Sequence, residues 1–283
     1  LQSRGLGDVY KRQSLPTIEG WERNLGTHDL RGRTAVVDPT LGGVPVDPAA
    51  RDVVEAAAEA LVAELGMRRI DLPVEIPRMG AEWMMGNVSS LFAEIEHLWP
   101  HRGSELTDEI RVGIQLTESL YNVRVAAAGE MLRRRANEAM AVLFEQADFV
   151  LTSSNPGPAF AADAAMCSEE RSFIDLARGS TAARLGFGWL LKAARVVSAV
   201  APGTPQRLLS AGTSHSPELL DMGALTMPAN LSGNPAVSIP AGDVGGLPIG
   251  LQVIGRHHRD ALLFDVALHV ERERPWPLTA PAQ

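Results

Sequence analysis

The sequence predicts an α/β protein in which helices pack around a central sheet. Short apolar runs of strand length alternate with longer segments whose apolar residues recur every three or four positions. A hydrophobic content of 45% over 283 residues is ordinary for a globular chain and suffices for a sizeable core. Neither an internal repeat nor a break in composition divides the chain, so we expect a single domain.

The first predicted unit is a strand, a helix and a second strand. Thr34–Asp38 is a short apolar run, and Asp47-Pro48 has the residue types of a helix N-cap and first turn. Gly66 suits the position just after a helix end, and Arg69–Val74 follows as the next strand. A β-α-β unit of this kind predicts two parallel strands joined by a right-handed crossover.

Helices dominate the middle of the chain. We expect a short amphipathic helix over Val88–Leu98 and one longer helix from about Thr107 to Ala147. A buried strand, Phe149–Thr152, then leads into the loop Ser153–Pro158. The predicted apolar stripe of the longer helix consists of Leu120, Val123, Ala127 and Met131.

The C-terminal part returns to strands. Residues 170–218 divide into an Ala-rich helical part, up to residue 200, and a surface loop rich in Pro, Gly, Ser and Thr. Two apolar strands, Ala236–Ile239 and Gly250–Ile254, are joined through a loop at residues 245–248. Asp260 begins a final amphipathic helix.

Charge and composition argue against several kinds of partner. The net charge of −8 and the isoelectric point of about 5.4 disfavour a nucleic-acid surface, which carries clustered basic residues. No apolar stretch approaches the roughly 20 residues of a membrane span. The single cysteine, Cys167, excludes an intrachain disulfide and favours a reducing, cytoplasmic compartment.

Four segments rich in Gly, Pro and apolar residues follow one another along the chain. They are Arg31–Val36 with Leu41–Pro48, Phe144–Thr152 with Asn155-Pro156, Met227–Gly242, and Gly246–Gly255. Together and in this order they resemble the amidase signature family. The resemblance implies a three-layer α/β/α fold with a mixed, here incomplete, central sheet. Residues 14–283 are then the C-terminal portion of a single amidase domain, and residues 1–13, which show no period, are interpreted as a non-native leader.

The chemistry of the family has no counterpart in this sequence. Family members cleave amides with a serine nucleophile, a second serine in a cis peptide and a lysine, and the nucleophile lies in a Gly/Ser-rich stretch. Neither Gly42-Gly43 nor Gly245-Gly246 begins such a stretch, and neither Lys11 nor Lys192 matches the lysine motif. In the family both catalytic segments precede the strand that corresponds to Thr34–Asp38. We therefore predict no catalytic residue in this chain and no activity from it alone.

Two asparagines are the predicted substrate-binding residues. Asn155 lies in the loop at the carboxyl end of a predicted strand, where ligands gather in open α/β sheets. The resemblance places this loop, and the Pro-Ala-Asn-Leu segment that contains Asn230, toward the active site. We expect a small-molecule amide as substrate and neither a cofactor nor a metal.

Other nucleophile arrangements are weaker. Ser153, Ser154, His215 and Asp221 could form a Ser-His-Asp triad, but the sequence has no Gly-x-Ser-x-Gly elbow. Cys167 is followed by acidic residues, which disfavour a thiolate nucleophile. We interpret all five as residues without a catalytic role.

Two further clusters have simpler interpretations than a site. His97 and His101 have helical metal-ligand spacing, but a proline lies between them and no third-ligand motif follows. The basic run at residues 133–135 lies between Glu130 and Glu138. This pattern predicts a salt-bridged, solvated helix face.

Three functions stay open at this point. The first is an amide hydrolase, and the second is the amidase subunit of a tRNA-dependent amidotransferase. The second is disfavoured because Gly223 stands where that branch typically has an acidic residue, with Asp221 two positions away. The third is a naturally short, non-catalytic binding protein. In each case an incomplete sheet would expose edges and apolar faces, so we expect poor stability or self-association, for example as a homodimer.

Overall fold

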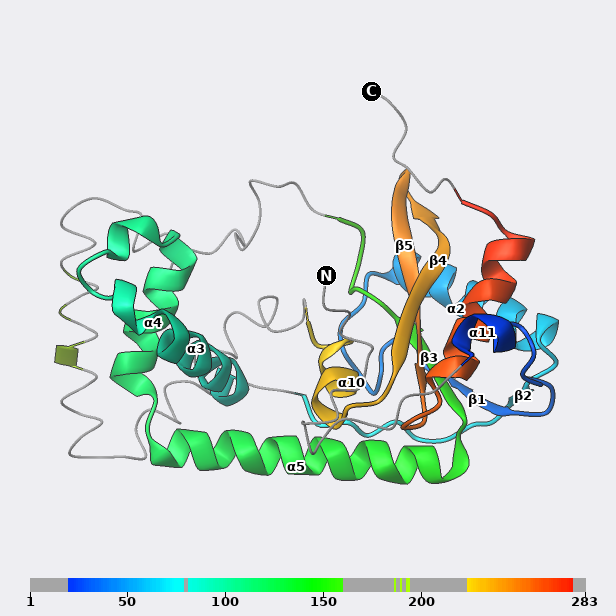
Figure 1. Ribbon diagram of the computed structural model, residues 1–283, viewed down its shortest axis with the longest axis horizontal. Coiled ribbons are helices and arrows are strands. Elements are labelled where there is room, and N and C mark those ends of the chain that lie inside the picture. Colours follow the sequence, from blue (N-terminus) through cyan, green and yellow to red (C-terminus); the bar gives the residue numbers. More distant parts are fainter. Residues whose placement is uncertain are drawn as a thin grey trace.

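The computed structural model describes residues 20–78, 81–159 and 223–276, together with positions 186, 189, 192 and 193. In these residues a mixed five-stranded sheet has helices on both faces, which confirms the predicted three-layer α/β class (Figure 1). The outer strand β2 continues through β1, β3 and β5 to β4, with β1 parallel to β2 and β3, and β5 antiparallel to its neighbours. Their bounds are β1 Thr34–Val37, β2 Arg68–Arg69, β3 Phe149–Ser153, β4 Ala236–Val244 and β5 Leu247–Gly255.

The predicted β-α-β unit is present. Helix α2, Pro48–Glu64, begins after Asp47, whose carboxylate accepts a hydrogen bond from the Ala50 amide at 3.0 Å. Gly66 follows the helix end with φ of 61°, the left-handed conformation that glycine adopts without steric cost. The strand predicted over Arg69–Val74 is wrong beyond its first residue.

The chain leaves the sheet after β2 for a packing reason. Ile70, Leu72 and Val74 pack against the hydrophobic cluster on the α5 side of the sheet. The alternation of apolar and polar residues that predicted a strand therefore marks a loop with one buried side. An alternation of apolar and polar residues fits both a half-buried strand and a loop with one buried side. Only the tertiary contacts distinguish the two.

The long helix predicted over residues 107–147 is two helices. Helix α4 is Asp108–Leu120 and helix α5 is Val123–Gln146. Asn122 separates them, since its backbone is extended and its side chain accepts hydrogen bonds from the Arg124 and Val125 amides. The predicted stripe is also wrong, because Val123 is 85% exposed while Val125 is buried.

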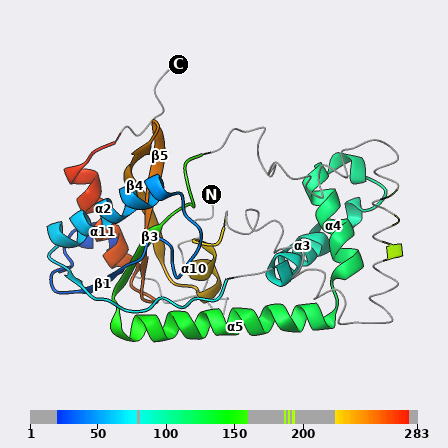
Figure 2. The same cartoon turned by 180° about the vertical axis from the view of Figure 1, so that it is seen from behind.

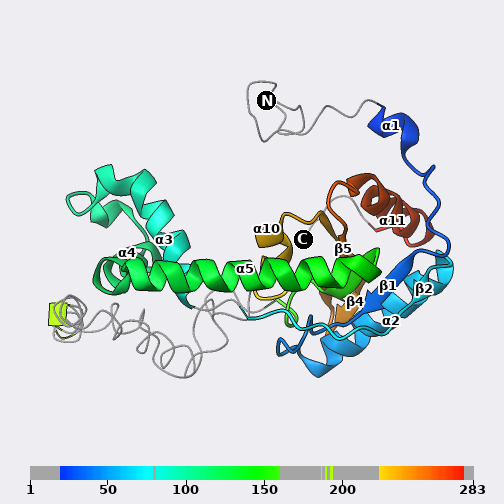
Figure 3. The same ribbon diagram turned by 90° about the horizontal axis from the view of Figure 1, so that it is seen from below.

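The remaining helices form the outer layers and an extension. Helix α3, Ala81–Ile95, is longer than the helix predicted from residue 88 and lies with α4 at the far end of α5 (Figure 3). The two short helices are α1, Trp21–Asn24, and α10, Met227–Ser232. The C-terminal helix α11, Asp260–Glu273, begins at the predicted residue. Two 3₁₀ turns, Glu96–Leu98 and Gly103–Glu105, lie between α3 and α4.

The two C-terminal strands form a longer hairpin than predicted. Each has nine residues, and the connection shrinks to Gly245-Gly246, with φ of 61° and 80°. Two consecutive residues of positive φ are what a tight hairpin turn between right-twisted strands requires. Leu247 and Pro248, predicted as loop, therefore belong to β5 and pair with Val244 and Asp243.

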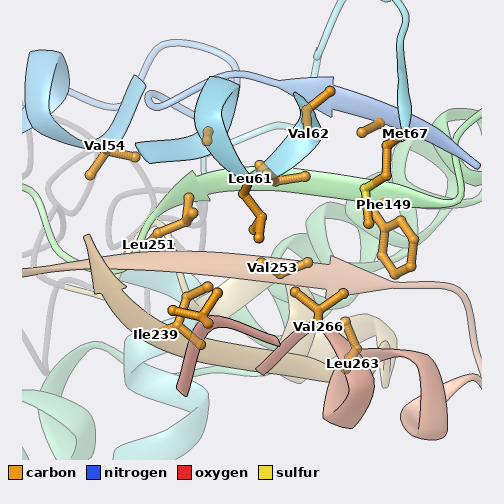
Figure 4. Close-up of a cluster of buried hydrophobic side chains, with 14 of the residues drawn as sticks. Val54, Leu61, Val62, Met67, Phe149, Ile239, Leu251, Val253, Leu263 and Val266 are labelled. Carbon is orange, nitrogen blue, oxygen red and sulfur yellow. The ribbon is translucent and has the colours of Figure 1, made fainter. Parts of the chain in front are cut away.

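Two hydrophobic clusters lie on opposite faces of the sheet. Alternating side chains of β3 supply both, because Phe149 and Leu151 contact one and Val150 the other. Figure 4 shows the first cluster, in which Leu61 of α2 and Val266 of α11 meet the sheet. Met140 of α5 packs on the second. Figure 2 shows α2 and α11 at the sheet end of the molecule, away from α3 and α4.

Several predicted features lie outside the described residues. They are the leader, the loop at residues 201–218, most of the helical stretch at 170–200, and Cys167, His215 and Asp221. Positions 186, 189, 192 and 193 in that stretch are helical. Among the residues that were searched, no helix has the length and hydropathy of a membrane span.

Candidate functional site

The carboxyl ends of β1 and β3 meet, and the loops that follow them pack together. The Asp38 amide donates to the Leu151 carbonyl at 3.0 Å, and the Ser153 amide donates to the Pro39 carbonyl at 3.3 Å. Further along, the Asp47 amide donates to the Pro156 carbonyl at 2.7 Å. The loop that contains Asn155 is therefore held against the start of α2, at the edge of the sheet where α/β proteins bind ligands.

Asp38 fixes the loop after β1. One of its carboxylate oxygens accepts hydrogen bonds from the Thr40 amide at 2.9 Å and the Thr40 hydroxyl at 2.7 Å, and the other accepts from the Gly42 amide at 2.9 Å. Gly42 has φ of 86°, and a Cβ there would lie 2.5 Å from the Val74 carbonyl oxygen. The loop thus has a defined shape beside the site.

Hydroxyl side chains gather at the end of β3. Thr152, Ser153 and Ser154 are all buried, and the Thr152 and Ser153 hydroxyl oxygens have no hydrogen-bond partner within the described structure. The Ser154 hydroxyl lies 2.5 Å from the hydroxyl of Ser238 on β4. This bridge crosses β5 above Gly250, which has no side chain to separate the two serines.

Polar contacts fix helix α10 along β5, from Gln252, which pairs with Thr152 near the carboxyl end of β3, to Gly255, which pairs with Phe149 at its amino end. The Gln252 side-chain amide donates to the Leu225 carbonyl at 2.9 Å, just before the helix. At the helix end, the Asn234 side-chain amide donates to the Gly255 carbonyl at 2.8 Å, and the Ser232 hydroxyl donates to Asn234 Oδ1 at 2.6 Å. These contacts place the Pro-Ala-Asn-Leu segment beside β5.

The two predicted substrate-binding residues are both exposed. Asn155 directly follows the buried Ser154, and Asn230 lies on α10. Their side chains are solvent-accessible, as a ligand contact requires. Their role in substrate binding stays a prediction.

The weaker candidates do not assemble into a site in the described residues. His97 and His101 are both exposed, and no group of three metal-ligating side chains occurs in the residues that were searched. Ser153 and Ser154 are placed, whereas the histidine and aspartate of the hypothetical triad lie outside the described residues.

The basic run on α5 forms the predicted salt-bridged face. Arg133 donates hydrogen bonds to Glu130, and Arg134 lies 3.6 Å from Glu138. The hydrogen bonds from Arg133 lower the pKa of Glu130. Lys192 is exposed and its ammonium lies 5.9 Å from the centroid of the Trp189 ring.

Sequence reasoning missed the hydroxyl bridge between Ser154 and Ser238. These residues are 84 positions apart, and nothing in either local pattern pairs them. The available signal was a run of three hydroxyl residues at the end of an otherwise apolar strand. Polar residues that continue a buried strand are a departure from the hydrophobic pattern, and such departures mark functional or strained positions.

Part of the chain is similar in sequence to known amidases. The amidase family model matches residues 190–264, which contain α10, β4 and β5. The acylamidase of Rhodococcus erythropolis is 44% identical over 72 residues, which are 25% of this chain and 15% of that protein. A glutamyl-tRNA(Gln) amidotransferase subunit of Clostridium kluyveri is 46% identical over 56 residues, which are 20% and 11% of the two chains.

Solved structures extend the likeness over most of the fold. A bacterial aryl acylamidase of the amidase signature family is 21% identical with a TM-score of 0.64, over 93% of this chain and 48% of that one. The 6-aminohexanoate cyclic dimer hydrolase is 19% identical with a TM-score of 0.66, over 95% and 50%. The fold is thus that of an α/β amidase, and this chain spans about half the length of these structural relatives. Residues 190–264 therefore resemble the amidase family in sequence, and the described fold resembles that of amidase signature enzymes.

Proposed function

We propose that this chain forms the structural scaffold and one wall of the substrate site in an amide hydrolase. Such an enzyme converts a carboxylic amide to an acid and ammonia or an amine. One observation carries the proposal. The segment that matches the amidase family model supplies α10, β4 and β5, of which β5 pairs with β3, and the Gln252 side chain of β5 donates to the Leu225 carbonyl just before α10. The segment that resembles the family therefore reaches the edge of the sheet at which α/β proteins bind ligands, which supports a role in the substrate site.

The described residues provide binding groups but no activated nucleophile. A serine attacks an amide only when a base removes its proton, and the family uses a lysine for this step. Among the described residues, the lysine is exposed and beside a tryptophan. We therefore expect the purified chain to release no ammonia or amine from simple carboxamides.

The decisive test is the genomic DNA upstream of codon 14. We expect the reading frame to continue into a lysine motif and a Gly/Ser-rich segment, and the extended product to hydrolyse acetanilide or benzamide. In that product, Asn155→Ala and Asn230→Ala should raise KM with a smaller effect on kcat. Turnover of a carboxamide by the present chain, abolished by changing one of its own side chains, would contradict the proposal.

A second candidate function is the amidase subunit of a tRNA-dependent amidotransferase. The observation in its favour is the 46% identity over 56 residues with the Clostridium kluyveri protein. In this case the extended product should be active only with partner subunits and aminoacyl-tRNA. Independent hydrolysis of a small amide would exclude it. A start codon immediately before residue 14 would instead favour a short binding protein.

Assembly and location belong to the same proposal. We place the protein in the cytoplasm because its single cysteine fits a reducing compartment. We propose a small-molecule amide as its ligand and a homodimer as its assembly. Neither a cofactor nor a nucleic acid is needed for the proposed reaction.

A further inference from the structure

We propose that Thr152, Ser154 and Ser238 form a subsite that binds an uncharged carboxamide group through hydroxyl contacts. The proposal rests on the amide hydrolase function above, because it names the group that this edge of the sheet recognises. It also extends that function, since it assigns binding to residues that neither the predicted site nor the family's catalytic serines include.

The three hydroxyls lie on one face of the sheet. Thr152 pairs in register with Gln252, and Gln252 pairs with Ser238, so the three residues form a row across β3, β5 and β4. Ser154 extends β3 by one step, because its amide donates to the Gly250 carbonyl at 2.9 Å. Residues two apart on a strand point to the same side, so Ser154 joins Thr152 on that face.

Gly250 makes the serine bridge possible. A Cβ at this position would lie 2.7 Å from the Ser154 hydroxyl oxygen, 2.9 Å from the Ser154 Cβ and 3.0 Å from the Ser238 hydroxyl oxygen. Gly250 does not have a positive φ. Glycine is therefore needed here for the room that its missing side chain leaves, and not for its backbone conformation. The two hydroxyls occupy the room that any other residue would fill.

The hydrogen-bonding capacity of the cluster exceeds what the structure uses. Two serine hydroxyls carry two protons and four lone pairs, and their mutual contact uses one proton and one lone pair. The Thr152 hydroxyl is fully buried and has no partner within the described structure. A buried hydroxyl without a partner costs about 1–3 kcal/mol, so a protein retains one mainly where a ligand or water completes it.

Access to the cluster comes from the β4 side. Ser238 is exposed, whereas its partner Ser154 is 6% exposed. A ligand that reaches Ser238 thus contacts the outer serine of the hydrogen-bonded pair, and Ser154 lies further inside. Asn155, which directly follows Ser154, is exposed as well and lies at the rim of the same region.

The cluster favours a carboxamide over a carboxylate. A carboxamide has both N–H donors and a carbonyl acceptor, so it can use the spare lone pairs and the spare proton together. A carboxylate has only acceptors and must lose much of its hydration to enter a neutral, partly buried cluster. Hydroxyl recognition would therefore retain an amide substrate and release the acid product.

The experiment measures binding of benzamide and benzoate to the full chain by ligand-observed NMR or calorimetry. We expect benzamide to bind and benzoate to bind at least about fivefold more weakly, as expected when one neutral hydrogen bond is lost. Ser238→Ala and Ser154→Ala should each raise the benzamide Kd about three- to tenfold. Ser90→Ala, on α3 outside the sheet, is the matched control and should leave Kd unchanged.

Each outcome decides the proposal. Thermal unfolding must show that Ser238→Ala, at an exposed position, retains the wild-type midpoint, so that a weaker Kd reports binding rather than folding. Benzamide binding that is equal in wild type and both site variants would overturn the subsite while leaving the hydrolase proposal intact. Benzoate binding as tight as benzamide would overturn the carboxamide preference. Failure of wild type to bind benzamide would overturn the subsite, whereas the hydrolase proposal depends on turnover by the extended product.

Discussion

Asp265 shows how one buried side chain can hold two distant parts of this chain together. Its side chain lies on α11 and is 3% exposed. It accepts hydrogen bonds from the Gly26 amide at 2.7 Å and from the His28 amide at 2.8 Å, and it contacts His28 Nδ1 at 2.8 Å. The segment before β1 is thereby attached to the C-terminal helix, 237 residues further along the chain.

Removal of this carboxylate is expected to destabilise the fold. Asp265→Ala leaves two backbone amides without their acceptor, so the free energy of unfolding should fall by about 2–4 kcal/mol. Urea denaturation followed by circular dichroism measures this change. Glu271→Ala, at an exposed position of the same helix, is the control and should shift it by less than about 0.5 kcal/mol. Equal effects of the two variants would contradict the role assigned to Asp265.

A second residue-scale prediction concerns Glu130. Hydrogen bonds from Arg133 lower the pKa of Glu130 in the folded chain, and the same contact raises the pKa of Arg133. A lowered folded-state pKa gives a stabilising contribution that is present above the ordinary carboxyl pKa. That contribution is lost as the pH falls through the folded-state value. Both groups are exposed, so salt should weaken the effect.

NMR titration of the Glu130 carboxyl carbon tests this pair. In Arg133→Gln the pKa of Glu130 should return toward the ordinary glutamate value, because the hydrogen-bond donor is gone. In Arg135→Gln the pKa should stay low, since that arginine is a neighbour on the same helix without the same contact to Glu130. An unchanged titration curve in Arg133→Gln would show that the contact does not form in solution.

At the scale of elements, a helix boundary set by a strong local interaction was predictable from the sequence. A boundary inside a segment of continuous helical spacing was not. The start of α2 at Asp47-Pro48 follows from the capping ability of aspartate and the fixed φ of proline, and both act within one helical turn. The break between α4 and α5 depends on one asparagine inside a segment that has helical spacing throughout. The three-residue spacing of Leu120 and Val123 happens to continue across this break, so the sequence pattern did not reveal the break.

The capping role of Asn122 can be tested directly. Asn122→Ala removes the acceptor for the Arg124 and Val125 amides at the start of α5, so the free energy of unfolding should fall by about 1 kcal/mol. Asn122→Asp and Asn122→Ser keep an acceptor oxygen and should recover most of the loss. Chemical denaturation of the three variants measures the series. Alanine and serine variants of equal stability would show that the side chain does not cap the helix.

At the scale of the whole molecule, we expect the edges of the sheet to govern self-association. β4 pairs with β5 on one side, and within the described residues no strand pairs with its other side. Most of its nine residues are exposed or partly buried, and exposed strand edges are templates for pairing with another chain. Two short strands, β1 and β2, form the opposite part of the sheet.

We therefore expect residues 14–283 to self-associate or to unfold without sharp cooperativity. Size-exclusion chromatography with light scattering, at several micromolar concentrations, measures the first property, and calorimetry measures the second. Ala236→Lys places a charge at an exposed position of β4 and should reduce association, because lysine disfavours edge-to-edge pairing. A monomer with one sharp thermal transition would contradict this expectation.

The sequence by itself determined the α/β class, the β-α-β unit, the start of α2 and the resemblance to the amidase signature family, because each of these depends on neighbouring residues or on motifs of fixed spacing. It also indicated the edge of the sheet where Asn155 lies. Only the tertiary structure decided that the run after Arg69 is a loop with one side packed on the core, that α4 and α5 are separate, and that Ser154 meets Ser238 over Gly250. The reason is physical. Burial and hydrogen bonding between residues far apart in the chain depend on how the layers pack, and no local pattern contains that information.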